Sequence, residues 1–262
     1  MSETITESER MELLLNYLTK LGRGLLANGA TVERAQLAIE KNAQAYHLKG
    51  KSCLVMNNYV SVCFHDNEGH TYMKQLSFQG DDINLEKLRL LNDVSYKVCR
   101  EHPDERELAH LLHETKKEKD LPDLVVAIFQ TLAITCICGI LGGSVRDMTG
   151  TSLVAFAMFW IFHFLDKLRT DAIINNTIGM FAATILAYVV TRAGIAEHVN
   201  WVIISESLLM IPGIPLVNAF RNLICGNEMN GMVQMLRVVL QSTFLALGTY
   251  AAVLLMGGAS AW

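Results

Sequence analysis

Charged residues are distributed unequally along the chain, and the division falls near Leu121. Of the 48 Asp, Glu, Lys and Arg residues, 35 lie in the first 120 positions and 13 in the remaining 142. The second part contains long runs that carry no charge at all. An α-helix needs roughly 20 apolar residues to cross the hydrocarbon of a bilayer. The pattern therefore predicts a water-soluble domain over residues 1–120 and a transmembrane domain over residues 121–262.

Five apolar segments of the second part predict five transmembrane helices embedded in the lipid bilayer. Four of these segments carry no charge, and one carries only Glu206. The segments are Leu124–Val145, Met148–Leu165, Ala172–Thr191, Val199–Phe220 and Val238–Trp262. The connections are short, and the first two are expected at Gly142–Gly150 and Asp166–Asp171.

Lysine and arginine indicate the orientation, because they favour the cytosolic ends of transmembrane helices. Seven fall on one side of the predicted bundle and two on the other. The first set is Lys116, Lys117, Lys119, Lys167, Arg169, Arg221 and Arg237, and the second is Arg146 and Arg192. We therefore expect a multi-pass protein of the cell (plasma or inner) membrane, with a cytosolic N-terminal domain and a C-terminus outside.

The first part of the chain changes from helical to strand periodicity and back. The predicted helices are Ser8–Asn28, Thr31–His47, Asn84–Glu101 and Asp104–Lys119, and the predicted strands are Ser52–Met56, Tyr59–His65 and His70–Phe78. The fold class is thus an integral membrane α-helical protein with five transmembrane helices. Its N-terminal cytosolic α+β domain has two helices, a small antiparallel sheet and two further helices.

Composition and motifs argue against several functional classes. The net charge of −4 and the lack of a long basic run give no indication of nucleic-acid binding. Met1–Arg10 has no apolar core, so we do not expect a secretory signal peptide. His110, His113 and Glu114 differ in order from the zinc-protease pattern. With no nucleotide-binding or hydrolase motif either, we expect no enzyme activity, no metal and no cofactor.

The sharpest local feature is the pair of prolines, Pro212 and Pro215, with Gly213 between them. Each proline removes a backbone donor and collides with the preceding turn. The fourth transmembrane helix should therefore break or kink near its middle. Freed carbonyls within a bilayer need protein or water around them, and broken helices recur at transport sites. A simple kink that only shapes packing is the alternative.

Several polar residues in the apolar spans are candidates for function. Glu206 could bind a proton or an ammonium group, unless the fourth helix starts late and leaves Glu206 at the outer interface. His163 could relay protons, or could simply lie at the cytosolic interface. Asn218 and Asn222 share a helix face and could line a cytosolic vestibule. Arg221 could attract a carboxylate substrate or only follow the positive-inside rule.

Two segments resemble the threonine/serine exporter family: Leu26–Arg34, and Ile211–Ala219 with its Pro-Gly-x-Pro-Leu-x-Asn-Ala motif. The resemblance covers nearly the whole chain and implies a cytosolic domain followed by membrane helices. It also implies the larger subunit of a two-component exporter, with a smaller all-membrane partner subunit. Some such exporters are associated with succinate. Asn222 and Gln234 depart from the family pattern, where an acidic and a basic residue are common.

Three functions compete at this point. The first is export of small polar metabolites, either threonine/serine-type amino acids or C4-dicarboxylates such as succinate, driven by the proton gradient. The second is a membrane-anchored hydrolase, and the third is a metabolite sensor that uses the N-terminal domain. Transport is favoured because the unusual residues lie in the membrane segments. Oligomers are possible.

Overall fold

The computed structural model describes residues 6–56, 58–66, 68–78, 83–115, 121–167 and 171–257. The chain divides into two compact units. The first contains residues 1–119 together with 220–231, and the second contains residues 120–219 and 232–262. Lys116, Lys117, Lys119, Arg169 and Trp262, on which part of the expected orientation depends, lie outside the described residues.

The first unit contains four helices of the N-terminal region, each near its predicted position. They are α1 (Glu7–Ala27), α2 (Val32–Ala45), α3 (Leu85–Glu101) and α4 (Glu105–Glu114). Side chains that favour N-caps begin them: Thr31 accepts from the N–H of Arg34, and Asn84 from the N–H of Lys87. α4 ends at Glu114, earlier than predicted, and the rest of that prediction falls mostly on undescribed residues.

A small antiparallel sheet near the N-terminus is confirmed, with β2 in the centre. Its strands are β1 (Lys49–Met56), β2 (Tyr59–His65) and β3 (Thr71–Ser77), in the order β1-β2-β3. Val60, Val62 and Phe64 lie buried on one face of β2. β1 starts three residues earlier than predicted, because its register shifts between Lys49 and Ser52 and Gly50 adopts a positive φ of 56°.

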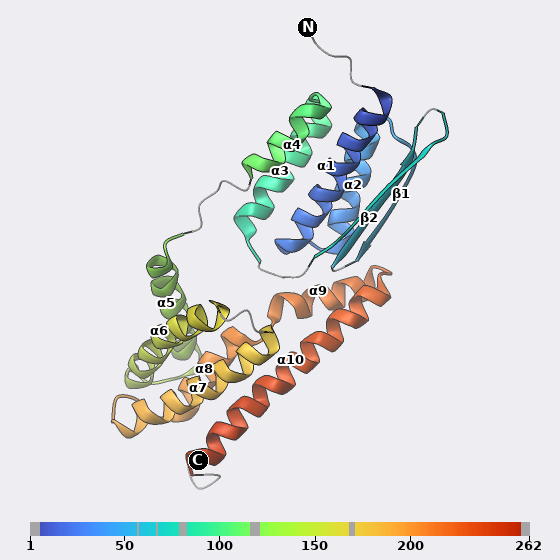
Figure 1. The fold of residues 1–262 in the computed structure, drawn as a ribbon. Helices are drawn as coiled ribbons and strands as arrows, with labels where there is room; N and C mark the ends of the chain where they lie inside the picture. The colour runs from blue at the N-terminus through green and yellow to red at the C-terminus, as the bar shows by residue number, and fades with distance from the viewer. Residues whose placement is uncertain are drawn as a thin grey trace. The chain divides into compact units, whose positions relative to one another are not determined.

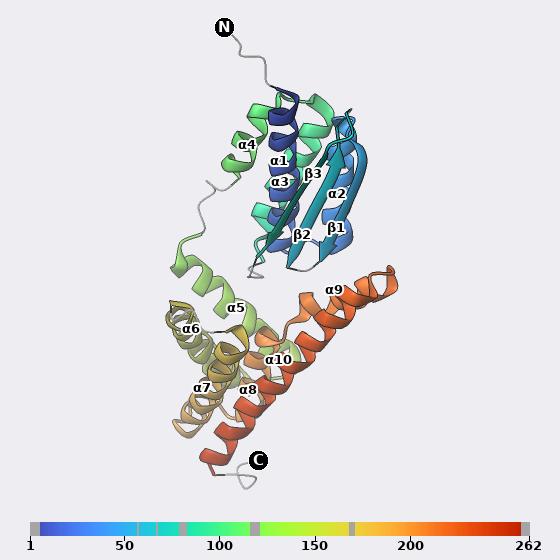
Figure 2. The same ribbon diagram turned by 45° about the vertical axis from the view of Figure 1, so that its right-hand side comes forward.

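The helices of the first unit cover one face of this sheet (Figures 1 and 2). α1 and α2 pack on the strands, α3 packs on α1 and α2, and α4 packs on α1 and α3. A polar group is satisfied inside this core: Asn42 accepts from Tyr17 Oη at 2.9 Å and donates to Ser95 Oγ at 2.7 Å. Burial raises the pKa of Tyr17 well above its usual value.

The second unit is helical and consistent with a multi-pass membrane protein. Its helices are α5 (Asp123–Leu141), α6 (Val145–Lys167), α7 (Ala172–Arg192), α8 (Val199–Met210), α9 (Gly213–Ile224) and α10 (Glu228–Leu255), with parts of α9 and α10 in the first unit. Among the described residues, four helices are long and apolar enough to cross a membrane, or five if α8 and α9 form one bent span. α8 packs against α5, α6 and α7.

α6 and α10 begin before the uncharged runs that predicted them, because both helices continue past charged residues. α6 begins at Val145 and includes Arg146 and Asp147, so the expected connection at Gly142–Gly150 shortens to a tight turn. α10 begins at Glu228, ten residues before the uncharged run. With 28 residues, α10 is ~42 Å long, which exceeds the ~30 Å hydrocarbon thickness. Its charged first turns can therefore extend beyond the bilayer.

Candidate functional site

The double-proline segment interrupts the helix predicted there, as expected from the sequence. α8 ends at Met210, α9 begins at Gly213, and the two helices are bent by 50°. Pro212 has no N–H for the carbonyl of Leu208, and the N–H of Gly213 donates to the carbonyl of Ile211 at 2.8 Å. The last carbonyls of α8 thus lose donors that a continuous helix would supply. Pro215 lies in the first turn of α9, where a proline costs no intrahelical bond.

Glu206 lies inside α8, because that helix begins at Val199 and does not start late. Only 1% of the residue is exposed, and neither carboxylate oxygen has a hydrogen-bond partner among the described residues. A buried carboxyl group without a partner is costly in any protein interior. The structure therefore places an unpaired acid one turn before the break.

His163 lies near the end of α6 and Glu206 lies within α8. The Nε2 atom of His163 is 4.0 Å from Asp123 Oδ2, at the start of α5. Its ring stacks on Phe159 and meets Trp160 edge to face. Aromatic side chains gather at membrane interfaces, so this environment favours the interfacial interpretation of His163. The structure does not bring His163 and Glu206 together.

Asn218, Arg221 and Asn222 follow the break on α9. Asn218 is half-buried, Asn222 is buried, and Arg221 is exposed. Within the first unit, Arg221 Nη2 lies 3.5 Å from Glu33 Oε2 in the first turn of α2. Asn230 Nδ2, after the α9–α10 turn, donates to the carbonyl of Val55 at 3.4 Å. Arg221 therefore has an acidic neighbour in this unit. The positive-inside rule alone does not predict such a neighbour.

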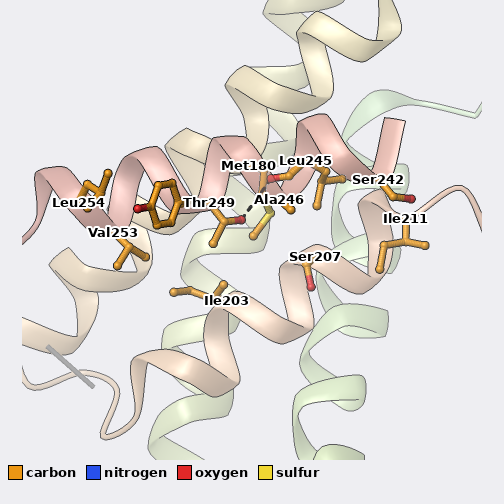
Figure 3. A pocket seen from close by; sticks show the side chains of 11 residues that line it. Met180, Ile203, Ser207, Ile211, Ser242, Leu245, Ala246, Thr249, Val253 and Leu254 are labelled. Carbon is orange, nitrogen blue, oxygen red and sulfur yellow. Dashed lines mark hydrogen bonds between the residues drawn. The ribbon is translucent and has the colours of Figure 1, made fainter. Parts of the chain in front are cut away.

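A pocket of about 560 Å³ adjoins the break within the second unit. Side chains from α7, α8 and α10 line it, including Ser207, Ile211 and Thr249 (Figure 3). Most of the lining is apolar. The hydroxyl of Ser207 donates to the carbonyl of Ile204 at 2.8 Å, and that of Thr249 to Leu245 at 3.3 Å. The polar capacity of these two hydroxyls is therefore partly used within their own helices.

Sequence reasoning missed a junction at the opposite end of α5 from Asp123. It consists of Ser144, Asp147, Glu197 and His198, and we call it the Asp147 junction. Asp147 Oδ2 accepts from the N–H of Ser144 at 3.0 Å, and Oδ1 accepts from the N–H groups of Glu197 and His198 at 2.8 and 2.7 Å. The Ser144-x-x-Asp147 spacing resembles a capping box and could have revealed the first of these contacts.

The Asp147 junction also meets a geometric criterion for a cation site. One ligand atom each from Asp147, Glu197 and His198 lies within 4.8 Å of the others. However, both oxygens of Asp147 face hydrogen-bond donors, and His198 Nδ1 lies 3.0 Å from Oδ2. A cation would have to displace these donors. The arrangement therefore fits a hydrogen-bonded junction better than a metal centre.

Comparison with known protein families gives one match. The family model described as "Putative threonine/serine exporter" matches residues 16–256, which include both units. No curated protein and no solved structure matches the chain. The matched family is a family of transporters, in agreement with the apolar helices of the second unit.

Proposed function

Because the chain belongs to the threonine/serine exporter family, we propose that it exports small polar metabolites from the cytosol through the broken fourth span. The observation that carries the proposal is the 50° break between α8 and α9, preceded by Glu206, whose carboxylate has no hydrogen-bond partner among the described residues. Broken helices near the middle of a membrane recur at transporter sites, where their exposed backbone groups bind solutes. The substrate is a threonine/serine-type amino acid or a C4-dicarboxylate such as succinate.

The pocket beside Ile211 supports this proposal, because it supplies room next to the break. Its volume of about 560 Å³ lies within the range of small-molecule sites. The carbonyls at the end of α8 offer acceptors for an ammonium group. We propose that Pro212, Gly213 and Pro215 shape this part of the substrate pathway, and that Asn218, Arg221 and Asn222 line its cytosolic mouth.

We further propose that Glu206 carries the coupling proton of a proton-gradient-driven exporter. An ionisable residue inside a membrane span is a functional candidate because its burial is otherwise unfavourable. His163 is a weaker candidate, since its contacts are those of an interfacial side chain. Replacing Glu206 with glutamine should alter the pH dependence of export, because the amide cannot exchange a proton.

The orientation and assembly are also proposals. We propose a cytosolic N-terminal domain and an external C-terminus, supported by the lysine and arginine bias of the sequence. We propose a smaller all-membrane subunit of the same family as partner, supported by the family resemblance. The chain should then co-purify with that subunit and should export little by itself. Robust export by the purified chain alone would instead indicate a homo-oligomer.

The proposed pathway is tested by replacing both Pro212 and Pro215 with alanine. Proline is disfavoured by ~3 kcal/mol in a helix interior, so these changes should not impair folding. They should straighten the span, restore donors to the α8 carbonyls, and sharply reduce export of labelled threonine or succinate from loaded cells. Pro122→Ala is the matched control, because Pro122 stands at the N-cap of α5. Full export by the double variant would remove the break from the pathway.

A further inference from the structure

The Asp147 side chain is buried at one end of the bundle, with 0% of its surface exposed. Its carboxylate receives four contacts from donors: the N–H groups of Ser144, Glu197 and His198, and His198 Nδ1. Hydrogen bonds to charged groups are stronger than those between neutral groups. A single carboxylate thus joins two segments that are about fifty residues apart in the sequence.

The four contacts link the starts of two helices. Ser144 precedes α6, and Glu197 and His198 precede α8. Unpaired N–H groups give a helix N-terminus a partial positive charge, which a carboxylate stabilises. Two contacts reinforce the link at the rim: Arg146 Nη1 lies 3.4 Å from Glu197 Oε1, and Thr149 Oγ1 lies 3.5 Å from the carbonyl of Ile195. Asp147 is the buried centre of this connection.

We propose that Asp147 is a positioning residue for export, which keeps the ends of α6 and α8 together and closes this end of the bundle. The proposal rests on the proposed function, in which this end faces outward. Glu206 lies eight residues beyond His198, or ~12 Å further along α8. A path from Glu206 to the outside between the α5–α6 turn and the start of α8 requires the Asp147 contacts to separate.

A native cysteine can report on this separation. Cys138 is completely buried near the end of α5, and its carbonyl accepts from the N–H of Gly143 in the α5–α6 turn. A Cβ atom at Gly143 would lie 2.6 Å from Cys138 Sγ and 3.4 Å from Asp147 Cβ. The thiol is therefore covered by the same turn that Asp147 holds. Loosening the Asp147 junction should expose it.

The test labels the full-length protein with a membrane-impermeant maleimide in right-side-out and in inside-out vesicles, and maps the modified cysteines by mass spectrometry. Asp147→Asn keeps the shape but replaces one acceptor oxygen with a donor group. His198→Ala removes only the ring contact. Arg192→Gln is the matched control, because it also removes one exposed arginine, but Arg192 contacts the carbonyl of Met256 and not the Asp147 junction.

Asp147→Asn should raise the labelling rate of Cys138 about tenfold or more, as expected for losing at least one charge-assisted hydrogen bond. His198→Ala should have a smaller effect in the same direction, and Arg192→Gln should have none. Asp147→Asn and His198→Ala should also speed the entry of labelled threonine or succinate down its gradient, measured per folded molecule, a change that lowered stability alone would not produce. Wild-type labelling and entry rates in folded Asp147→Asn and His198→Ala protein would overturn the proposal.

Two controls separate this result from the proposed function. Cys225, in the α9–α10 turn, should react only in inside-out vesicles. A reaction only in right-side-out vesicles would refute the proposed orientation. The effect of Asp147 on Cys138 would then be measured in inside-out vesicles. If Cys138 responds as expected but no substrate crosses in any variant, the positioning role in transport is overturned and only a structural junction remains. If export persists at the wild-type rate after Pro212 and Pro215 are replaced in a chain with Asp147 intact, the proposed pathway fails independently of Asp147.

Discussion

The two units differ in whether their buried polar side chains have hydrogen-bond partners. In the first unit, Tyr17, Asn42 and Ser95 are buried together and hydrogen-bond to one another. Among the described residues, every buried side-chain oxygen or nitrogen without a partner lies in the second unit. These atoms belong to Thr131, Thr151, Tyr188, Asn200 and Glu206.

This difference is the opposite of what the free-energy cost of burying unpaired polar groups predicts. Unpaired polar groups are at least as unfavourable in a membrane domain, which has no water in the surrounding hydrocarbon, as in a soluble core. A sequence selected only for stability would remove them first from the second unit. Polar groups inside a membrane domain are candidates for function, so these residues are the first positions at which the proposed solute pathway can be tested.

The largest change in stability should come from removing the buried Asn42 side chain, which hydrogen-bonds to Tyr17 and Ser95 in the first unit. Asn42→Ala removes the acceptor of Tyr17 and a donor to Ser95, and leaves buried polar atoms behind. We expect a loss of about 2–3 kcal/mol in the free energy of unfolding of this unit. Thermal unfolding of the purified chain, followed by circular dichroism, measures it. Asn92→Ala, at a half-buried site on α3, is the control and should cost less.

The reverse effect is expected in the second unit. Glu206→Met replaces a partnerless carboxyl with an apolar side chain of similar length, so no hydrogen bond is lost and a desolvation cost is removed. The bundle should unfold in detergent at a higher temperature, with a gain of about 1 kcal/mol. Export should fall at the same time. Lower stability would mean that Glu206 has a bonding partner in the folded protein.

The smallest effect concerns a titratable pair on the first unit. Burial tends to raise the pKa of Asp66, but the backbone N–H and ring of His70 outweigh it and hold that pKa below its usual value. The hydrogen bond to Asp66, and its charge, raise the pKa of His70. The pair stabilises the fold fully when Asp66 is ionised and His70 is protonated, between about pH 4 and 6.5.

This contribution should decline as pH rises through the raised pKa of His70, and as pH falls through the lowered pKa of Asp66. The difference in melting temperature between the wild type and His70→Ala should therefore be largest near pH 5–6 and smaller at pH 9. His110→Ala, at an exposed ring 3.9 Å from Glu114, serves as the control. A His70→Ala difference that does not vary with pH would exclude a stabilising ion pair.

The sequence alone determined the features that depend on local chemistry. Uncharged runs located the helices that are long and apolar enough to cross a membrane, because hydrocarbon excludes charge along any continuous helix. The prolines located the break, because proline lacks an N–H wherever it stands. Period-two alternation located β2 with its observed bounds. Thr31 was likewise identified as an N-cap from its neighbours alone.

Only the tertiary structure decided which polar groups meet and which remain alone. Glu206 could be recognised as unusual, but its lack of partners depends on the facing surfaces of the surrounding helices. The Asp147 junction joins residues about fifty positions apart, and no local pattern records the second half of that contact. The start of α10 at Glu228 was also missed, because a helix can carry charge where it leaves the hydrocarbon. Local patterns report the solvent that a segment requires, whereas partners are set by how the segments pack.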